Sequence, residues 1–348
     1  MSTPQCTAPV KGHQVAHSRA TCPVHGFMPG TESIPVSALA NALSARGLDD
    51  EEIATLVQDA KYRATWNKEL DPSELALLAK DESEEIRLRV AERRDTPPEV
   101  LVMLAGDDAP EVRGSVAANE VTPAETLLAM AKDDDAYVRY WVAANESAPA
   151  EALAMLADED DWRTRRHVAE HKHIPPAVLA VLARDVEEDV RVAVAANKRA
   201  SSALLTALAT DSAEVVQRVV AEKRNLSPTV LHVLATSIHD NVRARVAEHE
   251  NTSTVTLAAM AAGDDPYVQR LVAKHRRASW ETLTRLADSE FEDVRDEALP
   301  AVVARIRLTL GIDTENTAAI DHLRGHEWWT MKRNDPAVTV ALALSPNA

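Results

Sequence analysis

Residues 96–147 read TPPEVLVMLAGDDAPEVRGSVAANEV and then TPAETLLAMAKDDDAYVRYWVAANES, which are two versions of one 26-residue pattern. The pattern occurs nine times without a slip, with starts at 70, 96, 122, 148, 174, 200, 226, 252 and 278. Fixed self-similarity at such a period indicates a stack of small structural units. The first residue of each repeat is position 0, and the last is position 25.

Each half of the repeat carries a helical stripe of apolar residues. Position 5 is Leu in all nine repeats, position 8 is Leu or Met, and position 9 is Ala. The spacing i, i+3, i+4 places these side chains on one face of a helix. In the second half, position 16 is Ile or Val except at Thr164, and positions 20 and 21 are Val and Ala in eight repeats. The small Ala predicts close approach of neighbouring backbones, so we expect two short helices per repeat.

The helix ends also have sequence signals. Thr96 and Thr122 are predicted N-caps, each followed by Pro and completed by Glu99 or Glu125 as a capping box. We expect Asp at position 11 to cap the second helix. Asn at position 23 suits a left-handed helix end.

Neither helix is long enough to be stable alone, because isolated helices shorter than about 12–15 residues are marginal in water. Each unit must therefore bury its apolar stripe against the next unit, which predicts an all-α solenoid. We expect residues 31–69 and 300–348 to form helical caps at the ends of the nine-repeat solenoid over 70–299, because the repeat pattern is absent there.

The motifs L-x-x-L-A-x-D, V-R-x-x-V-A-x-N and T-P, taken together, resemble the leucine-rich repeat variant family. The resemblance covers about two thirds of the chain. It implies a right-handed superhelix in which an α-helix alternates with a shorter helix, related to HEAT-type repeats. It also implies an interaction role, and it implies no enzyme.

The N-terminal segment, residues 1–30, differs in composition and holds both cysteines of the chain. Cys6, His13, Cys22 and His25 form a Cys-x6-His-x8-Cys-x2-His pattern, and two thiolates with two imidazoles suit a closed structural Zn²⁺ site. His17 is an alternative to His13, and a disordered tail is the alternative to a metal site. Family members can carry an N-terminal cysteine cluster for an iron–sulfur centre, but this chain lacks the four Cys that such a centre normally needs.

Composition narrows the function classes. The net charge of −17 argues against general binding to nucleic acid or anionic membranes. No apolar run reaches the roughly 18–20 residues that span a bilayer, and the N-terminus lacks a signal-peptide core. We therefore expect a soluble, cytoplasmic protein. Phosphate-binding loops, nucleophile elbows and His-Glu-x-x-His motifs are absent from the sequence, which favours a protein that is not an enzyme.

Position 17 is Arg in seven repeats and Gln at Gln217 and Gln269. This row is either a set of donors for an acidic ligand or a set of pairs with the position 11 or 12 acid of a neighbouring repeat. We expect the pairs, because Asp and Arg recur together.

Residues that vary between repeats are the candidates for partner binding. At positions 18 and 19, the third and fourth repeats bring together Tyr140, Trp141, Arg166 and His167. Aromatic residues and Arg are typical of interface hot spots. The alternative is that the aromatic residues only pack sideways between repeats.

The turn after the second helix becomes basic along the chain, with Lys198, Arg199, Lys223 and Arg224 as the central residues. We call these four residues the basic edge. It suits an acidic partner or a phosphate backbone, although such a charge run is also common on a solvated edge. The sequence thus predicts a scaffold for a protein partner, and a nucleic-acid-binding repeat protein is the alternative.

Overall fold

The computed structural model describes residues 39–310 except positions 40, 42, 68 and 69, and within this range every element is an α-helix. This confirms the predicted all-α class. The chain divides into two compact units, residues 1–100 and 101–348. The first unit contains α2 (Asp50–Ala64), α3 (Pro72–Leu78) and α4 (Glu84–Glu92), and α5 (Pro98–Leu104) crosses the boundary.

The second unit contains two short helices per repeat. The first helices are α7 (Ala124–Met130), α9 (Ala150–Leu156), α11 (Pro176–Leu182), α13 (Ser202–Leu208), α15 (Pro228–Leu234), α17 (Thr254–Ala261) and α19 (Trp280–Ala287). The second helices are α6 (Pro110–Ala118), α8 (Ala136–Ala144), α10 (Trp162–Glu170), α12 (Glu188–Ala196), α14 (Glu214–Ala221), α16 (Asp240–Glu248), α18 (Pro266–Lys274) and the longer α20 (Glu292–Leu310).

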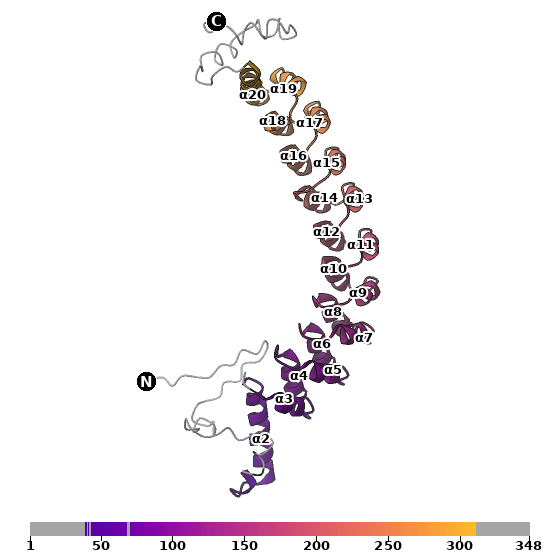
Figure 1. Ribbon diagram of the computed structural model, residues 1–348, viewed down its shortest axis with the longest axis vertical. Coiled ribbons are helices and arrows are strands. Elements are labelled where there is room, and N and C mark those ends of the chain that lie inside the picture. The colour runs from indigo at the N-terminus through magenta and orange to yellow at the C-terminus, as the bar shows by residue number, and fades with distance from the viewer. Residues whose placement is uncertain (1–38, 40, 42, 68–69, 311–348) are drawn as a thin grey trace, which may run out of the picture. The chain divides into compact units, whose positions relative to one another are not determined.

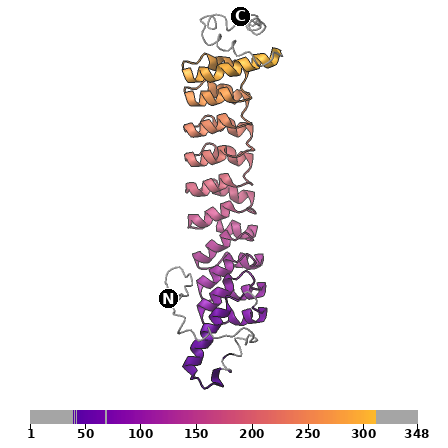
Figure 2. The same ribbon diagram turned by 90° about the vertical axis from the view of Figure 1, so that its left-hand side faces the viewer.

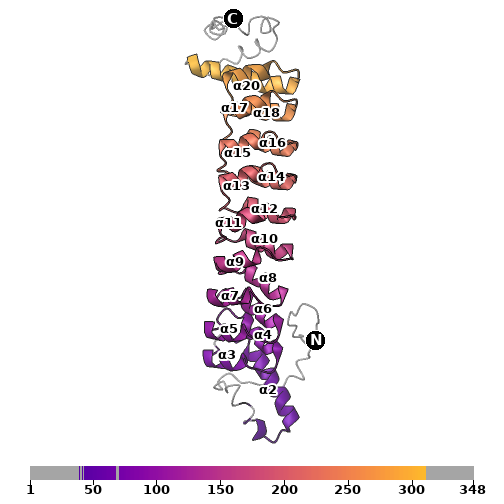
Figure 3. The same cartoon turned by 90° about the vertical axis from the view of Figure 1, so that its right-hand side faces the viewer.

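Within the second unit the helices form two columns, which together make a curved α-solenoid (Figure 1). The first helices lie on the outer, convex side, and the second helices lie on the inner, concave side. Figure 2 faces the inner side and Figure 3 the outer side, and both show the helices lying across the direction of stacking.

The core of the second unit consists of the two predicted stripes. Position 20 is a fully buried Val from Val116 to Val272, and the following Ala is at most 3% exposed from Ala117 to Ala273. These Ala residues have no side chain beyond Cβ, so adjacent second helices approach closely on the inner side. The close approach on one side only is consistent with the curvature of the stack.

The predicted N-caps of the first helices lie one residue too early. Thr96 and Thr122 instead donate their hydroxyls to Val90 O and Val116 O, at 2.6 Å, in the preceding second helix. The N-cap is position 1. It is Pro in α7, α9 and α11, and it is Ser in α13, α15, α17 and α19, where the hydroxyl accepts from the third backbone N–H.

The acid at position 11 is also not the N-cap of the second helix. Asp133 Oδ1 accepts from the backbone N–H of Asp135, at 2.9 Å, and so holds the turn before the helix. The N-cap is position 13, where Asp135 and Asp161 accept from the N–H two residues on. The sequence signal was misassigned because Asp favours both this turn and the cap.

The predicted pairing of position 17 with the neighbouring repeat is confirmed in the second unit. In four successive joints the Arg Nε and Nη2 donate to both oxygens of the position 11 carboxylate of the next repeat, at 2.7 to 3.0 Å. Two-point geometry of this kind fixes orientation as well as distance. The pairs are Arg113–Asp133, Arg139–Glu159, Arg165–Asp185 and Arg191–Asp211.

Where position 17 is Gln, the opposite position 11 is Ser. Gln217 accepts from the Ser237 hydroxyl at 2.5 Å, and Gln269 accepts from Ser289 at 3.2 Å. In both classes the position 17 side chain also donates to a carbonyl at position 11 of its own repeat, as Arg113 does to Asp107 O and Gln217 to Asp211 O. The two positions therefore change together, from a charged pair to a neutral one.

Position 23 forms a second ladder, which we call the carbonyl ladder. Its side chains donate to the carbonyls that end the second helix of the preceding repeat, where the helix leaves backbone oxygens without partners. No described non-Gly residue has positive φ, so the left-handed helix end predicted for Asn is wrong. The contacts are Asn145 to Asn119 O, His171 to Asn145 O, Asn197 to His171 O, Lys223 to Asn197 O, His249 to Lys223 O and His275 to His249 O.

The His members of the carbonyl ladder are held in one tautomer. In His171, Nδ1 accepts from the backbone N–H of His173 at 3.1 Å, so Nε2 carries the hydrogen that reaches Asn145 O. His275 has the same arrangement with Arg277 and His249. A proton on Nδ1 would face an N–H group, so this geometry requires the neutral ring.

Helix α2 begins with a complete capping box between Asp49 and Glu52 and lies within the stretch 31–69 that was predicted as a helical cap. Helix α20 continues through Pro300 to Leu310. The rest of the predicted C-terminal cap, residues 311–348, lies outside the described residues, and so does the Cys/His segment. Among the described helices, none combines the length and the apolar character that a bilayer crossing needs.

We predict that Ala195→Leu lowers the free energy of unfolding by about 1–3 kcal/mol, because a larger side chain overpacks the fully buried seam between second helices. Denaturant unfolding of the full chain measures this effect. The control is Ala196→Leu on the same helix, where the side chain is exposed and the stability should hardly change. Equal stability of the two variants would mean that the seam is elsewhere.

We also predict that the protein loses stability as the pH falls. Burial lowers the pKa of His171 and of His275 below the ordinary 6.5, so the unfolded chain takes up protons at a higher pH than the native one. Stability is therefore constant above about pH 7 and falls as the pH drops through about 6.5 towards the native pKa. Urea midpoints between about pH 5 and 8 measure the loss.

Two variants, each lacking one His, test whether His171 causes this pH effect. Of the groups around His171, Glu146 raises its pKa, whereas His173 and Lys172 lower it. His171→Asn copies the residue that the ladder uses at Asn197, so it should flatten the pH dependence. His173→Asn changes an exposed ring and should leave most of it. An identical pH profile for His171→Asn and the parent would contradict the assignment.

Candidate functional site

Four rings from two adjacent repeats gather on the inner side of the second unit. Tyr137, Tyr140 and Trp141 come from α8, and His167 comes from α10; we call them the aromatic cluster. Ring centroids lie 5.3 Å apart for Tyr140 and Trp141 and 5.0 Å apart for Tyr140 and His167, each pair edge to face. Edge-to-face contacts add roughly 0.5–1.5 kcal/mol beyond area burial, so the cluster is a stabilised surface feature.

The cluster depends on a glycine in the preceding repeat. A Cβ on Gly114 would lie 2.3 Å from Cε1 of Tyr137 and 3.4 Å from Cδ1 of Trp141. All the other repeats have a residue larger than Gly at this position 18. The absence of a side chain at Gly114 lets Tyr137 lie across α6, while 48% of Tyr137 remains exposed.

Not all polar groups of the cluster have a hydrogen-bond partner. The Tyr140 hydroxyl and His167 Nε2 are joined by a hydrogen bond of 3.0 Å between repeats. Burial lowers the pKa of His167, so the ring is neutral at pH 7. The indole N–H of Trp141 is buried and has no hydrogen-bond acceptor among the described residues.

Arginine side chains border the aromatic cluster on α10. Arg166 is exposed and donates to Glu170 at 2.8 Å. Arg163 is exposed and lies over the Trp162 ring at 5.0 Å. Of the four residues that the sequence selected here, the structure places Tyr140, Trp141 and His167 in contact, and Arg166 precedes His167 on α10. The structure adds Tyr137, whose contact with Gly114 joins position 15 of one repeat to position 18 of the preceding one and so has no signature within a single repeat.

Not every cation of the basic edge is available to bind a partner. Lys223 Nζ donates to Ala196 O and Asn197 O, both at 3.0 Å, as part of the carbonyl ladder. Nearby cations are paired with acids of the preceding repeat: Lys172 with Glu146 at 2.6 Å and Arg276 with Glu250 at 3.8 Å. Lys198, Arg199 and Arg224 are exposed.

Another surface feature was not anticipated. On the outer side, position 7 of the first helices places Met103, Met155 and Val181 in solvent, and Val181 is 67% exposed. The signal was present in the sequence as an apolar residue at position 7, outside the predicted stripe. Isolated exposed apolar side chains are common, so they do not define a site by themselves.

The four predicted metal ligands, Cys6, His13, Cys22 and His25, lie outside the described residues. Within the described ranges, no group of three or more His, Cys, Asp or Glu side chains is arranged to hold a metal ion.

Comparison with known proteins gives structural likenesses only. No family model matches the chain, and no curated protein matches it. Among solved structures, the chain is similar to a leucine-rich repeat variant described as having a novel repetitive protein structural motif, at 30% identity and a TM-score of 0.47, over 58% of this chain and 81% of that one.

Two further likenesses are to helical proteins of other kinds. A condensin Cnd3–Cnd2 subcomplex from S. pombe is similar at 14% identity, over 88% of this chain and 56% of that one, with a TM-score of 0.29. A computationally designed armadillo repeat protein for modular peptide recognition is similar at 16% identity, over 77% and 99% of the two chains, with a TM-score of 0.12. The solenoid architecture described above follows from the helices of this chain alone.

Proposed function

We propose that this protein is a non-enzymatic scaffold that binds a segment of a protein partner on the inner side of its second unit, across α8 and α10. The observation that carries the proposal is the aromatic cluster, with Tyr137 half exposed over Gly114 and with arginines beside it. We further propose that the chain is a leucine-rich repeat variant protein, on the strength of its repeat motif.

The composition of the site favours a protein partner. Tyr, Trp and Arg carry most of the binding energy in protein interfaces, and they do so from well-packed central positions. Rings fixed by edge-to-face contacts and by the Tyr140–His167 hydrogen bond lose little conformational freedom when a partner binds. The unpaired Trp141 N–H suits a main-chain carbonyl of a bound segment, which would reach it if Tyr137 turned away from Gly114.

The basic edge supports nucleic-acid binding less well. Lys223 is already engaged with main-chain carbonyls, and the chain carries a net charge of −17. Binding to a phosphate backbone needs several unpaired cations on one surface. We therefore keep nucleic acid as an outcome that the binding experiment can distinguish.

We also propose a structural Zn²⁺ site in the N-terminal segment, held by Cys6, His13, Cys22 and His25, with His17 as an alternative to His13. Two thiolates and two imidazoles make a closed donor set that suits Zn²⁺ and leaves no position for a substrate. Its role would be to fold a segment that lies outside the repeat pattern.

We predict that Tyr140→Ala together with Trp141→Ala abolishes capture of the protein partner from a cell extract, because the two rings supply the centre of the surface. Affinity capture with the full chain as bait, followed by identification of the bound protein, measures this. The control is Trp280→Ala, which removes an exposed ring on α19. Melting curves must show that both variants remain folded.

Two results would contradict the scaffold proposal. The first is a captured set that is the same for the cluster variant and the parent. The second is that the cluster variant still captures the partner, whereas nuclease treatment abolishes capture and so does changing Lys198, Arg199 and Arg224 to Glu. That result would favour nucleic acid.

For the metal site, we predict about one Zn per chain and no iron by elemental analysis of the purified full-length protein. The double change Cys6→Ser and Cys22→Ser should release the zinc, whereas His173→Asn, which changes an exposed His of the solenoid, should not. Full zinc retention in the double Cys variant would exclude this donor set.

A further inference from the structure

One joint of the second unit departs from the rule that positions 17 and 11 match. Elsewhere Arg faces an acid and Gln faces Ser, as described above. In the joint between the repeats that start at 226 and 252, Arg243 is kept, but position 11 is Gly263. The Arg side chain is therefore present without the carboxylate that its counterparts bind.

Arg243 keeps the hydrogen bond that its counterparts make within their own repeat. Its Nη1 donates to Ser237 O at 2.9 Å, the carbonyl at position 11 of its own repeat, as Arg113 does to Asp107 O. Its Nη2 donates to Asp240 Oδ1 at 2.6 Å and to Asp265 Oδ2 at 3.0 Å. Its Nε has no hydrogen bond to any described residue, whereas the four counterparts donate this group to a carboxylate at 2.7 Å.

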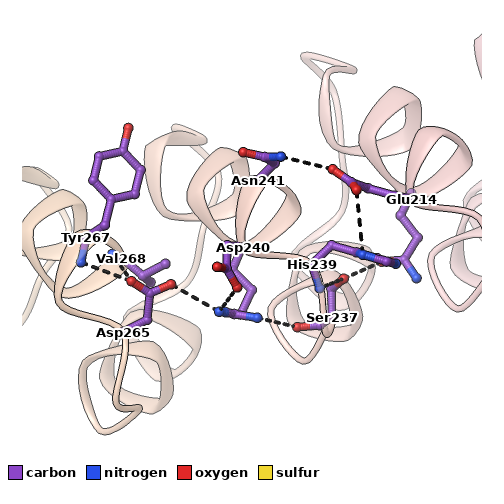
Figure 4. Close-up of polar contacts among 10 residues, drawn as sticks. Glu214, Ser237, His239, Asp240, Asn241, Asp265, Tyr267 and Val268 are labelled. Carbon is purple, nitrogen blue, oxygen red and sulfur yellow. Dashed lines mark hydrogen bonds and ion pairs between the residues drawn. The ribbon is translucent and has the colours of Figure 1, made fainter.

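A cavity lies where the missing side chain would be. A pocket of about 660 Å³ is lined by Arg243, Gly263, Asp240, Asp265, Met260 and His232, among others. Figure 4 shows Ser237, Asp240 and Asp265 around this joint. Gly263 has no positive φ, and a Cβ there would meet only Met260 O, at 3.4 Å, so the pocket has room for a side chain that the sequence does not supply.

We propose that this pocket binds the carboxylate group of an external ligand, which takes the place of the position 11 acid on Arg243 Nε and Nη2. The four intact joints show the contacts that the ligand would make. The site lies on α16 and on the turn before α18, so it does not depend on the aromatic cluster or on the function proposed for it.

An intact joint holds a carboxylate at the corresponding place despite acids next to it in the sequence. In an intact joint, Asp133 occupies the same place beside Asp134 and Asp135, just as the pocket lies beside Asp264 and Asp265. Burial opposes the ionisation of Asp133. The hydrogen bonds from Arg113 and from the Asp135 N–H, with the charges of Arg113 and Arg139, outweigh burial, so the pKa of Asp133 lies below its ordinary value. Asp240, whose side chain is 76% exposed, can turn to solvent and release Nη2.

The test follows the Arg Nε–H signals of the full-length protein by NMR during titration with sodium acetate, with sodium chloride at equal ionic strength as the reference. We expect one Nε–H signal to shift saturably with acetate only. Arg243→Gln should remove that signal. The fold should tolerate this change, because Gln217 and Gln269 occupy the same position in other repeats.

A matched pair at Gly263 decides between this pocket and general anion binding. Gly263→Asp supplies an internal carboxylate, so the acetate affinity should fall by at least about tenfold. Gly263→Ala adds only a Cβ and should keep the affinity. The proposal is overturned if Gly263→Asp binds acetate as the parent does, or if chloride produces the same shift.

Three blocked peptides identify the source of the carboxylate. Acetyl-Gly-Gly-Gly with a free C-terminus presents a chain end, its C-terminal amide presents none, and acetyl-Gly-Glu-Gly amide presents an acidic side chain. Binding of the first or third peptide assigns the site to a chain end or to an acidic side chain of a partner. Binding of acetate alone assigns it to a small free acid. Binding of the amide of the first peptide would contradict a carboxylate site.

Discussion

The burial of each short helix pair against its neighbour is the constraint on which this structure depends. Helices of seven to nine residues gain too little from their own hydrogen bonds to persist in water, so every repeat of the second unit is stable only within the stack. Val at position 20 and Ala at position 21 provide the contact. Because position 21 has no side chain larger than that of Ala, the inner helices approach closely. Curvature and the concave face then follow from this seam.

Polar side chains fix the alignment of the stack that apolar burial alone would leave loose. Apolar contacts are not directional, and a helix pair could slide or rotate on its neighbour at little cost. The paired guanidinium and carboxylate groups and the carbonyl ladder are directional, and each joins one repeat to the next. Partly buried ion pairs are modest sources of stability, but they disfavour competing registers strongly when they recur.

The sequence predicted the fold class, the period, the core stripes and the pairing of position 17, because these features depend on side-chain spacing that is repeated many times. It misplaced the caps at Thr122 and Asp133, since the same residue types satisfy helix ends and the turns next to them. It identified Tyr140, Trp141, Arg166 and His167 by their variability, and the structure places the three rings of this set in contact. It did not find Tyr137 over Gly114, because that contact joins two positions of different repeats.

The residue types at position 17 of one repeat and position 11 of the next match each other. This matching limits which whole repeats can be deleted or duplicated without loss of the polar contact between repeats. Removing residues 122–147 would bring Arg113 opposite Glu159 and preserve a charged pair at the new junction. Removing residues 200–225 would place Arg191 opposite Ser237 and leave a guanidinium without its anion. Repeats of equal length are therefore not interchangeable parts. Duplication or loss of whole repeats therefore keeps this polar contact at a new junction only where donor and acceptor types agree.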